Sequence, residues 1–247
     1  MKAEEYDLMY RVEEKHWWYA GMQAITRRML VNAGLAGRKI KILDAGCGTG
    51  GAISGYLAQY GNVTGCDLSA MALGFCQKRN ISEIAQASVT DLPFAQEQFE
   101  LVTSFDVLYE RGVGNDQRAV TEFWRVLQDN GYLFLRLPAY DWLRGEHDER
   151  IQTARRYTRA QVRKMLVQNG FEIVHLTYAN TFLFPIALAK RLFEKIRPAR
   201  AEKSDLEATH PWLDPFLAKL LASEAPLITR TGLPFGLSVL ALARKRR

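Results

Sequence analysis

The sequence has few of the residues that build disulfide-rich or metal-centred proteins. Its 247 residues include only three cysteines and four histidines. The cysteines, at positions 47, 66 and 76, are odd in number and fall in a loop, a strand and a helix of the predicted fold. They therefore predict no disulfide framework, and a reducing cytoplasm is the expected location. No metal site is predicted.

Long apolar runs are also missing. The longest, residues 182–189 and 233–243, are far shorter than the roughly 20 residues that a membrane-spanning helix needs. The first residues, MKAEEYD, include the acids Glu4 and Glu5, whereas an export signal has a basic start followed by an apolar core. We therefore expect neither a membrane span nor export.

The first three quarters of the chain have no excess of either charge. Residues 1–185 contain 21 Lys and Arg and 21 Asp and Glu, whereas residues 186–247 contain 12 and 6. The net charge of +6 therefore lies in the tail, which would attract anionic surfaces. One interpretation is peripheral membrane contact through the basic residues 244–247 and an apolar helix at 211–222. The other is that this helix packs on the domain and the basic end is solvated.

A glycine-rich turn follows an apolar strand in residues 40–51, IKILDAGCGTGG. Glycines at this density favour a sharp turn that another molecule approaches closely. Two spacings fit: a dinucleotide fingerprint with glycines at 46, 48 and 51, and an S-adenosylmethionine pattern with Asp44 before glycines at 46, 48 and 50. In both, Asp67 is the acid that binds ribose hydroxyls after the next strand. Asp44 favours the second pattern, because a carboxylate there can receive a ligand ammonium but would repel a pyrophosphate.

Helices and strands are predicted to alternate along the chain, which indicates a mostly parallel sheet with helices on both faces. A final antiparallel strand after a helical insertion would complete a seven-stranded, Rossmann-like α/β fold. We expect one domain over residues 1–247, with an N-terminal helical cap at 1–38, a cofactor-binding core at 39–178, and the insertion and last strand at 179–247. The predicted helices are 4–33, 49–60, 69–79, 114–128 (ended by Gly131), 159–169, 185–196 and 211–222; the strands begin at 40 and continue as 62–67, 84–89, 99–105, 131–137, 171–178 and 236–243, with a polar linker at 198–209.

Five motifs together resemble the class I S-adenosylmethionine-dependent methyltransferases over about residues 40–178. They are DAGCGTG at 44–50, DLS at 67–69, LPF at 92–94, FELV at 99–102 and RVLQDNGYL at 125–133. The resemblance implies S-adenosylmethionine as cofactor. It also implies in-line methyl transfer to an oxygen or nitrogen of a small-molecule, glycan or lipid-linked acceptor.

The resemblance also assigns cofactor-binding residues. It places Asp44 and the backbone of Gly46 and Gly48 against the methionine end, Asp67 on the ribose hydroxyls and Leu68 against adenine. Ser88 stands where the family commonly has an acid, so Ser88 and the Val89 backbone would read the adenine amino group. The predicted set is completed by three further residues: Cys47, Gly50 and Phe105.

The segment 140–157 leaves the predicted sheet beside the ligand crevice. We predict that it closes over the acceptor together with Trp17 and Trp18, and that Tyr140 contacts the acceptor. For the two tryptophans, a role in the core fits equally well. His147 and Tyr109 are the candidate catalytic residues. His147 is the preferred base, because a histidine titrates near neutral pH. A surface position, in which His147 pairs with a neighbouring acid, is the alternative.

Other classes of function stay open. An RNA methyltransferase is disfavoured because the basic excess lies in the tail, away from the predicted crevice, and no RNA-binding module is visible. A non-catalytic cofactor-binding or scaffold protein is disfavoured because Asp44, the glycines and Asp67 are all present. Hydride transfer with a nicotinamide is the remaining enzymatic alternative. The sequence indicates no oligomeric state.

Overall fold

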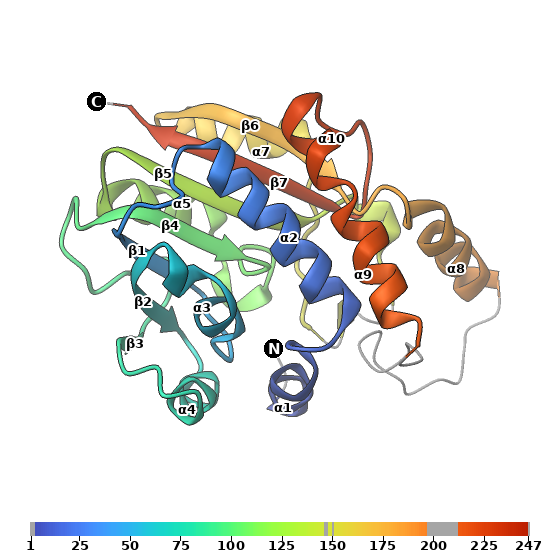
Figure 1. Ribbon diagram of the computed structural model, residues 1–247, viewed down its shortest axis with the longest axis horizontal. Coiled ribbons are helices and arrows are strands. Elements are labelled where there is room, and N and C mark those ends of the chain that lie inside the picture. Colours follow the sequence, from blue (N-terminus) through green and yellow to red (C-terminus); the bar gives the residue numbers. More distant parts are fainter. Residues whose placement is uncertain (1–2, 146–147, 150, 197–211, 247) are drawn as a thin grey trace.

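The computed structural model contains one seven-stranded sheet with the strand order β3-β2-β1-β4-β5-β7-β6 (Figure 1). The structure describes residues 3–145, 148, 149, 151–196 and 212–246. The pairs among β1 to β5 are parallel, and β7 runs antiparallel to both β5 and β6. The strands are β1 (Ile40–Ala45), β2 (Gly61–Asp67), β3 (Ile84–Gln86), β4 (Phe99–Phe105), β5 (Leu127–Pro138), β6 (Phe171–Ala179) and β7 (Ser238–Lys245).

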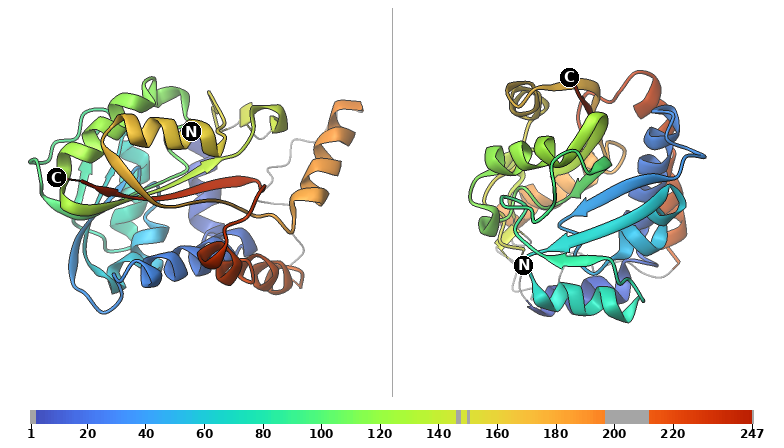
Figure 2. Two further views of the ribbon diagram at one scale, coloured as in Figure 1. Left: turned by 90° about the horizontal axis from the view of Figure 1, so that it is seen from above. Right: turned by 90° about the vertical axis from the view of Figure 1, so that its left-hand side faces the viewer.

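Helices cover both faces of the sheet, with α2, α9 and α10 on one face and α5 and α7 on the other (Figure 2). Within the described ranges, no helix is both long and apolar enough to cross a membrane. The helices are α1 (Ala3–Val12), α2 (Trp17–Asn32), α3 (Gly51–Gly55), α4 (Ala70–Lys78), α5 (Asp116–Val126), α7 (Arg159–Gln168), α8 (Phe184–Ile196), α9 (Asp214–Ala222) and α10 (Ala225–Arg230), with short 3₁₀ turns η1 (Leu57–Gln59), η2 (Arg111–Val113) and η3 (Asp141–Leu143).

The predicted fold is confirmed: a mostly parallel, seven-stranded sheet with an antiparallel last strand, N-terminal helices and a helical insertion before β7. The predicted helix ending at Gly170 is α7, which begins after a capping box formed by Thr158 and Gln161. The predicted linker at 198–209 lies outside the described residues.

Four predictions about individual helices were wrong. Residues 4–33 form two helices, because residues 13–16 break the run and the Nδ1 atom of His16 caps α2 by accepting from the Trp18 N–H at 3.3 Å. The helix expected at 49–60 is only α3 and a 3₁₀ turn, since Tyr56 has φ −158°. Gly131 does not end α5, which stops at Val126 and leads directly into β5. Helix α10 was not predicted.

The strand β5 shows how the sheet separates two cores. Leu133 and Leu135 face the core beneath α5 and α7, whereas Phe134 faces the core beneath α2, because side chains alternate along a strand. All three side chains are fully buried. The next position on the face of Phe134 is Arg136, so a charged side chain stands where the pattern would continue with an apolar one.

The insertion is fixed to the sheet by Glu224, a fully buried carboxylate just before α10. Its oxygens accept backbone hydrogen bonds from Asn180 at 2.7 Å, Thr181 at 2.7 Å and Phe182 at 2.8 Å. These three residues follow β6 directly. One side chain thus satisfies two buried donors and a partly buried one, and it joins the end of β6 to the residues that lead into α10.

We predict that Glu224→Ala lowers the free energy of unfolding by about 3 kcal/mol or more, because three N–H groups, two of them buried, lose their acceptor. Urea unfolding followed by circular dichroism measures the change. Glu83→Ala is the matched control, since Glu83 is exposed. Equal unfolding midpoints for the two variants would show that the Glu224 bonds do not hold the insertion.

Candidate active site

A cavity of about 850 Å³ lies at the carboxyl ends of the parallel strands. Residues from the ends of β1, β2, β4 and β5 line it, together with residues 87–89 after β3. The sequence places the ligand at this edge of the sheet, and the structure brings the expected groups together there. Among the predicted site residues, the following line the cavity: Trp17, Trp18, Asp44, Gly46, Cys47, Gly48, Asp67, Leu68, Ser88, Val89, Phe105 and Tyr109.

The glycine loop brings bare backbone to the cavity wall. Gly46 has φ +81°, and a Cβ atom there would lie 2.3 Å from Val107 Cγ2. Gly48 has φ +55°, and its Cβ would lie 2.9 Å from Met9 Cε. Both positions therefore favour glycine for conformation and for space. Gly50, in contrast, does not line the cavity; with φ +82° it is the residue before α3.

Asp44 is a buried carboxylate at the end of β1, with 2% of its surface exposed. Thr103 Oγ1 donates a hydrogen bond to Asp44 Oδ1 at 2.7 Å. Burial raises the pKa of Asp44 to about 6, although the Thr103 hydrogen bond and the charge of Arg136 oppose the rise. A buried carboxylate facing a cavity is suited to a ligand cation.

Asp67 joins the loops that follow β1 and β2. Its Oδ2 atom accepts from Gly48 N–H and its Oδ1 atom from Ser69 N–H, both at 2.9 Å. Burial raises the pKa of Asp67, and these two hydrogen bonds oppose the rise. Two bonds leave part of the carboxylate's acceptor capacity for a ligand hydroxyl.

The region after Asp67 provides an apolar surface. Leu68 lines the cavity with 57% of its surface exposed, which suits contact with a planar ring. Val89 lines the same cavity and is buried. The Ser88 hydroxyl is 2.8 Å from Thr90 Oγ1 and also accepts from the Thr90 N–H, so it already has hydrogen-bond partners.

The N-terminal segment covers the cofactor loop. Tyr6, Met9 and Glu13 line the cavity from α1 and the turn after it. Glu13 accepts a hydrogen bond from Thr49 and pairs with Arg79 at 2.8 Å, and both Glu13 and Arg79 have little exposed surface. This buried ion pair fastens the end of α1 to the glycine loop. This ion pair was not predicted, because its partners are 66 residues apart in the sequence.

The cysteines of this region are free. Cys47 lines the cavity, and its Sγ atom lies 3.9 Å from Cys76 Sγ in α4. The hydrogen bond with the Cys76 thiol and burial both raise the pKa of Cys47. The two thiols pack together in one buried apolar cluster.

An arginine and an aspartate meet beside the aromatic residues at the centre of the cavity wall. Asp106, with φ +59°, follows β4 and accepts from Arg136 Nε at 2.6 Å. The Arg136 guanidinium lies 4.7 Å from the Trp18 ring centroid and 4.8 Å from that of Phe105. Arg136 was not predicted as a site residue, because it lies within the mainly apolar run that was predicted as strand 131–137.

Tyr109 is buried and lines the cavity. Burial raises its pKa well above the ordinary value, and the charges of Asp106 and Glu110 raise it further. Its hydroxyl therefore stays protonated at neutral pH and can donate a hydrogen bond. A phenol in this state does not accept a proton, so Tyr109 is suited to positioning an acceptor.

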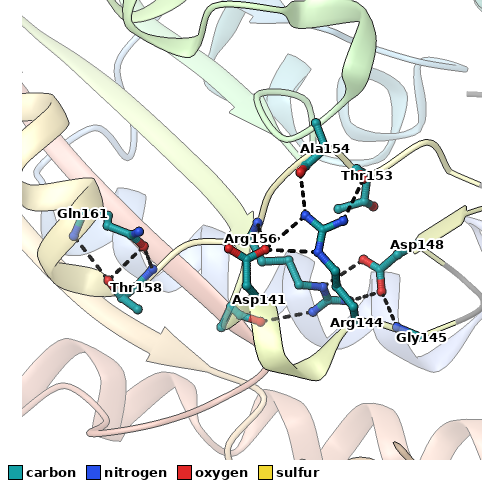
Figure 3. Close-up of polar contacts among 10 residues, drawn as sticks. Asp141, Arg144, Gly145, Asp148, Thr153, Ala154, Arg156, Thr158 and Gln161 are labelled. Atoms are coloured by element: carbon teal, nitrogen blue, oxygen red, sulfur yellow. Dashed lines mark hydrogen bonds and ion pairs between the residues drawn. The ribbon is translucent and has the colours of Figure 1, made fainter. Parts of the chain in front are cut away.

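The segment after β5 is folded on itself by ion pairs (Figure 3). Asp148, 3% exposed, accepts from Arg156 Nε at 2.8 Å and Nη2 at 3.0 Å. Burial alone would raise the pKa of Asp148, but Arg156 and the Gly145 N–H lower it. Arg144 donates to the carbonyls of Thr153 and Ala154. This bracing holds Asp148, Ile151, Gln152 and Arg156 at the cavity wall.

Of the two predicted residues of this segment, Tyr140 is described and His147 is not. Tyr140 does not line the cavity; its ring stacks on Tyr178 at 5.2 Å and on Trp142 at 5.4 Å, against β6. His147 lies outside the described residues. In the described ranges, no group of three or more His, Cys, Asp or Glu side chains is placed to bind a metal.

The insertion supplies the remaining wall of the cavity, which the sequence did not predict. Its contribution is mainly apolar, with two basic residues from α8. The residues are Leu183, Ile186, Ala187, Lys190, Arg191 and Leu217. A mixed apolar and basic helix was visible in the sequence, but the contact with the N-terminal helices depends on tertiary packing. The N-terminal segment and the insertion therefore both line the cavity.

Comparison with known proteins identifies the middle of the chain. Residues 43–135 match the methyltransferase domain family. A malonyl-[acyl-carrier protein] O-methyltransferase of Enterobacter lignolyticus is 38% identical over 110 residues, which are 44% of this chain and 43% of that protein. A fatty-acid O-methyltransferase of Mycolicibacterium smegmatis is 35% identical over 125 residues, 45% of this chain and 44% of that protein. The chain thus spans less than half the length of these curated relatives.

A solved S-adenosylmethionine-dependent methyltransferase of Thermotoga maritima has the same fold. It superposes with a TM-score of 0.60 at 14% identity, over 98% of this chain and 96% of that one. The family match covers the glycine loop and the strands β1 to β5, and the fold likeness covers the cap and the insertion as well. Residues 43–135 therefore match the methyltransferase domain family, and the chain as a whole has the fold of this S-adenosylmethionine-dependent methyltransferase.

Proposed function

We propose that this protein transfers a methyl group from S-adenosylmethionine to an oxygen or nitrogen of a small-molecule or lipid-linked acceptor. The observation that carries the proposal is the single cavity, in which the residues suited to the cofactor share one space with an apolar and aromatic wall. The two O-methyltransferases among the relatives favour oxygen, since their named substrates are a malonyl-acyl carrier protein and a fatty acid.

The donor set fits S-adenosylmethionine. Asp44 would hold the ammonium of the methionine end, and the backbone at Gly46 and Gly48 would lie against it, where a Cβ atom would take up the space. Asp67 would accept from the ribose hydroxyls, and Leu68 would lie against adenine. When bound, the cofactor supplies a methyl carbon that leaves the sulfonium sulfur with its bonding electron pair and joins a lone pair of the acceptor.

The chain's own residues would mainly align the acceptor and exclude water. Orientation contributes on the order of 7–11 kcal/mol at best to such reactions. Trp17 and Trp18 line the cavity and would form the acceptor wall, and the protonated Tyr109 hydroxyl would donate to it. We keep His147 as the proposed base for an acceptor that must lose a proton, since its neighbour Asp148 lies at the cavity wall.

We predict that Asp67→Ala weakens S-adenosylmethionine binding by about 2 kcal/mol or more, because a charged acceptor for the ribose is lost and the Gly48 and Ser69 N–H groups lose their partner. Isothermal titration calorimetry measures the affinity. The exposed Asp129, at the opposite end of β5, gives the control variant Asp129→Ala. Parental affinity in a folded Asp67→Ala protein would refute the assignment.

We predict that S-adenosylmethionine binding weakens as the pH falls through the pKa of Asp44, about 6. Only the ionised carboxylate pairs with an ammonium, so protonation below that pKa removes the interaction. Between about pH 7 and about pH 5 the affinity should fall about tenfold. Calorimetry at several pH values tests this, with Asp44→Asn as the reference. An equally steep pH dependence in Asp44→Asn would assign the titration to another group.

We also propose peripheral contact with an anionic membrane, made by α8 and α9 rather than by the C-terminal residues. Arg244 and Arg246 pair with Glu172, and Lys245 is 1% exposed, donating to the Leu127 carbonyl at 2.8 Å. Large apolar side chains are instead exposed on or beside the insertion helices: Ile186 at 68%, Trp212 at 69% and Phe216 at 62%. Ile186 also lines the cavity, so a lipid-linked acceptor could enter there.

We predict that Phe216→Asp reduces co-sedimentation with phosphatidylserine vesicles several-fold, because it places a negative charge on the apolar contact surface. Val167→Asp is the matched control, since Val167 is 55% exposed on α7, at the opposite face of the sheet. Sedimentation of the parent protein that is the same with and without anionic lipid would remove the membrane proposal.

A further inference from the structure

Arg136 is a buried cation whose terminal nitrogens have no hydrogen-bond partner among the described residues. The residue is 8% exposed and lines the cavity. Only its Nε atom donates within the described part of the chain, to Asp106 Oδ2. The two Nη atoms are left for a ligand. An arginine fork with unused donors in a largely water-excluded wall is a typical binding site for a planar anion such as a carboxylate.

Its surroundings fix the direction of the guanidinium. Trp18 and Phe105 lie 4.7 and 4.8 Å from the guanidinium carbon, so two aromatic faces constrain the group. Asp106 holds Nε from the adjacent strand. The Asp106 carboxylate bonds to Nε and leaves the Nη donors of the guanidinium unused. Buried donors without a hydrogen-bond partner cost free energy. The side chain is thus oriented in advance for a second acid.

The cavity wall supplied by the insertion and by the segment after β5 is mainly apolar, with Lys190 and Arg191 of α8 as basic residues in it. Leu183, Ile186 and Ala187 come from α8 and the residue before it, Leu217 from α9, and Leu143 from the segment after β5. Ile186 is 68% exposed, so this wall continues to the outside of the protein. A ligand with a long hydrocarbon portion could therefore leave its head group in the cavity and extend its chain along α8.

We infer that Arg136 binds the carboxylate of an acceptor that carries an apolar chain, and that this carboxylate is the methylated group. The inference rests on the proposed function and names its acceptor class. A carboxylate is ionised at neutral pH, so its oxygen has a lone pair available and no proton must be removed. The oxygen forms the new bond to the methyl carbon, the sulfur keeps the electrons of the old bond, and the product is a methyl ester.

This acceptor class needs no base, and several titratable side chains of the cavity already have other roles. The pKa of Tyr109 is raised well above its ordinary value, so its hydroxyl stays protonated. Asp44 is bonded to Thr103 and Asp106 to Arg136. His16 caps α2 through Nδ1, and burial lowers its pKa. A hydroxyl acceptor would need a base, such as Glu110 of the cavity or the proposed His147, whereas a carboxylate needs none.

A second carboxylate could be the ligand of Arg136: that of the cofactor's methionine end. Arg136 lies close enough to Asp44 for its charge to lower the pKa of that carboxyl. The chemistry of the contact is the same in both cases. The acceptor is favoured because the apolar wall formed by α8 and α9 belongs to the same cavity. The experiment below separates the two sources.

The test measures binding rather than turnover. Dodecanoate and dodecanol, which share a chain and differ in the head group, are titrated by calorimetry into the protein saturated with S-adenosylhomocysteine. We expect dodecanoate to bind about tenfold or more tightly than dodecanol. Arg136→Met should remove this difference, and Arg136→Lys should retain part of it. Arg163→Met, at an exposed position on α7, is the control and should bind like the parent.

Each other outcome overturns the inference. Equal binding of dodecanoate and dodecanol to the parent protein excludes a carboxylate site without any variant, even if Arg136→Met does not fold. A tenfold loss of S-adenosylhomocysteine affinity in Arg136→Met and Arg136→Lys, with dodecanoate binding intact, assigns Arg136 to the cofactor. Failure of the parent protein to bind S-adenosylhomocysteine would instead refute the proposed function. Titration of dodecanoate into the protein without S-adenosylhomocysteine would still test the role of Arg136.

Discussion

The carboxylate of Asp67 accepts backbone hydrogen bonds from Gly48 and Ser69, and these bonds hold together the loops that follow β1 and β2. The rest of the cavity depends on this contact. The glycine loop must approach β2 closely, which requires the positive φ angles at Gly46 and Gly48. The same loop then receives the Glu13 and Arg79 ion pair that fastens the N-terminal cap. One buried acid therefore positions backbone, cofactor-facing side chains and cap together.

The N-terminal cap and the insertion before β7 complete the cavity wall. Helix α2 carries Trp18 to the cavity, and α9 packs along α2 so closely that a Cβ atom at Gly21 would lie 2.6 Å from Leu221. Glu224 fixes the start of α10 to the end of β6. The central sheet and its loops supply the cavity wall that contains Asp44, Asp67 and the glycine loop. The cap and the insertion supply the mainly apolar wall. Arg136 lies between these two parts of the cavity wall. It is on the face of β5 that carries Phe134, at a position where the pattern predicts an apolar residue.

The sequence was sufficient for the parts of the structure that depend on local pattern. Apolar runs, turn residues and the spacing of Asp44, the glycines and Asp67 predicted the sheet and the cofactor side. The break at His16, the short α3 and the cavity wall from α8 depend on tertiary contacts that have no local signal. Arg136 was missed because a buried arginine inside a strand run is recognisable only when its neighbours are known. Tyr140 was assigned to the acceptor from its place after β5, but its ring packs on Tyr178.

The central claim is that S-adenosylmethionine binds in this cavity in the orientation set by Asp44 and Asp67. A crystal structure with S-adenosylhomocysteine tests it most directly. The account predicts the ribose hydroxyls within hydrogen-bond distance of the Asp67 carboxylate, the ammonium on the Asp44 side and the adenine against Leu68. Electron density for the ligand away from these residues, or its absence from crystals grown at saturating ligand, would contradict the account.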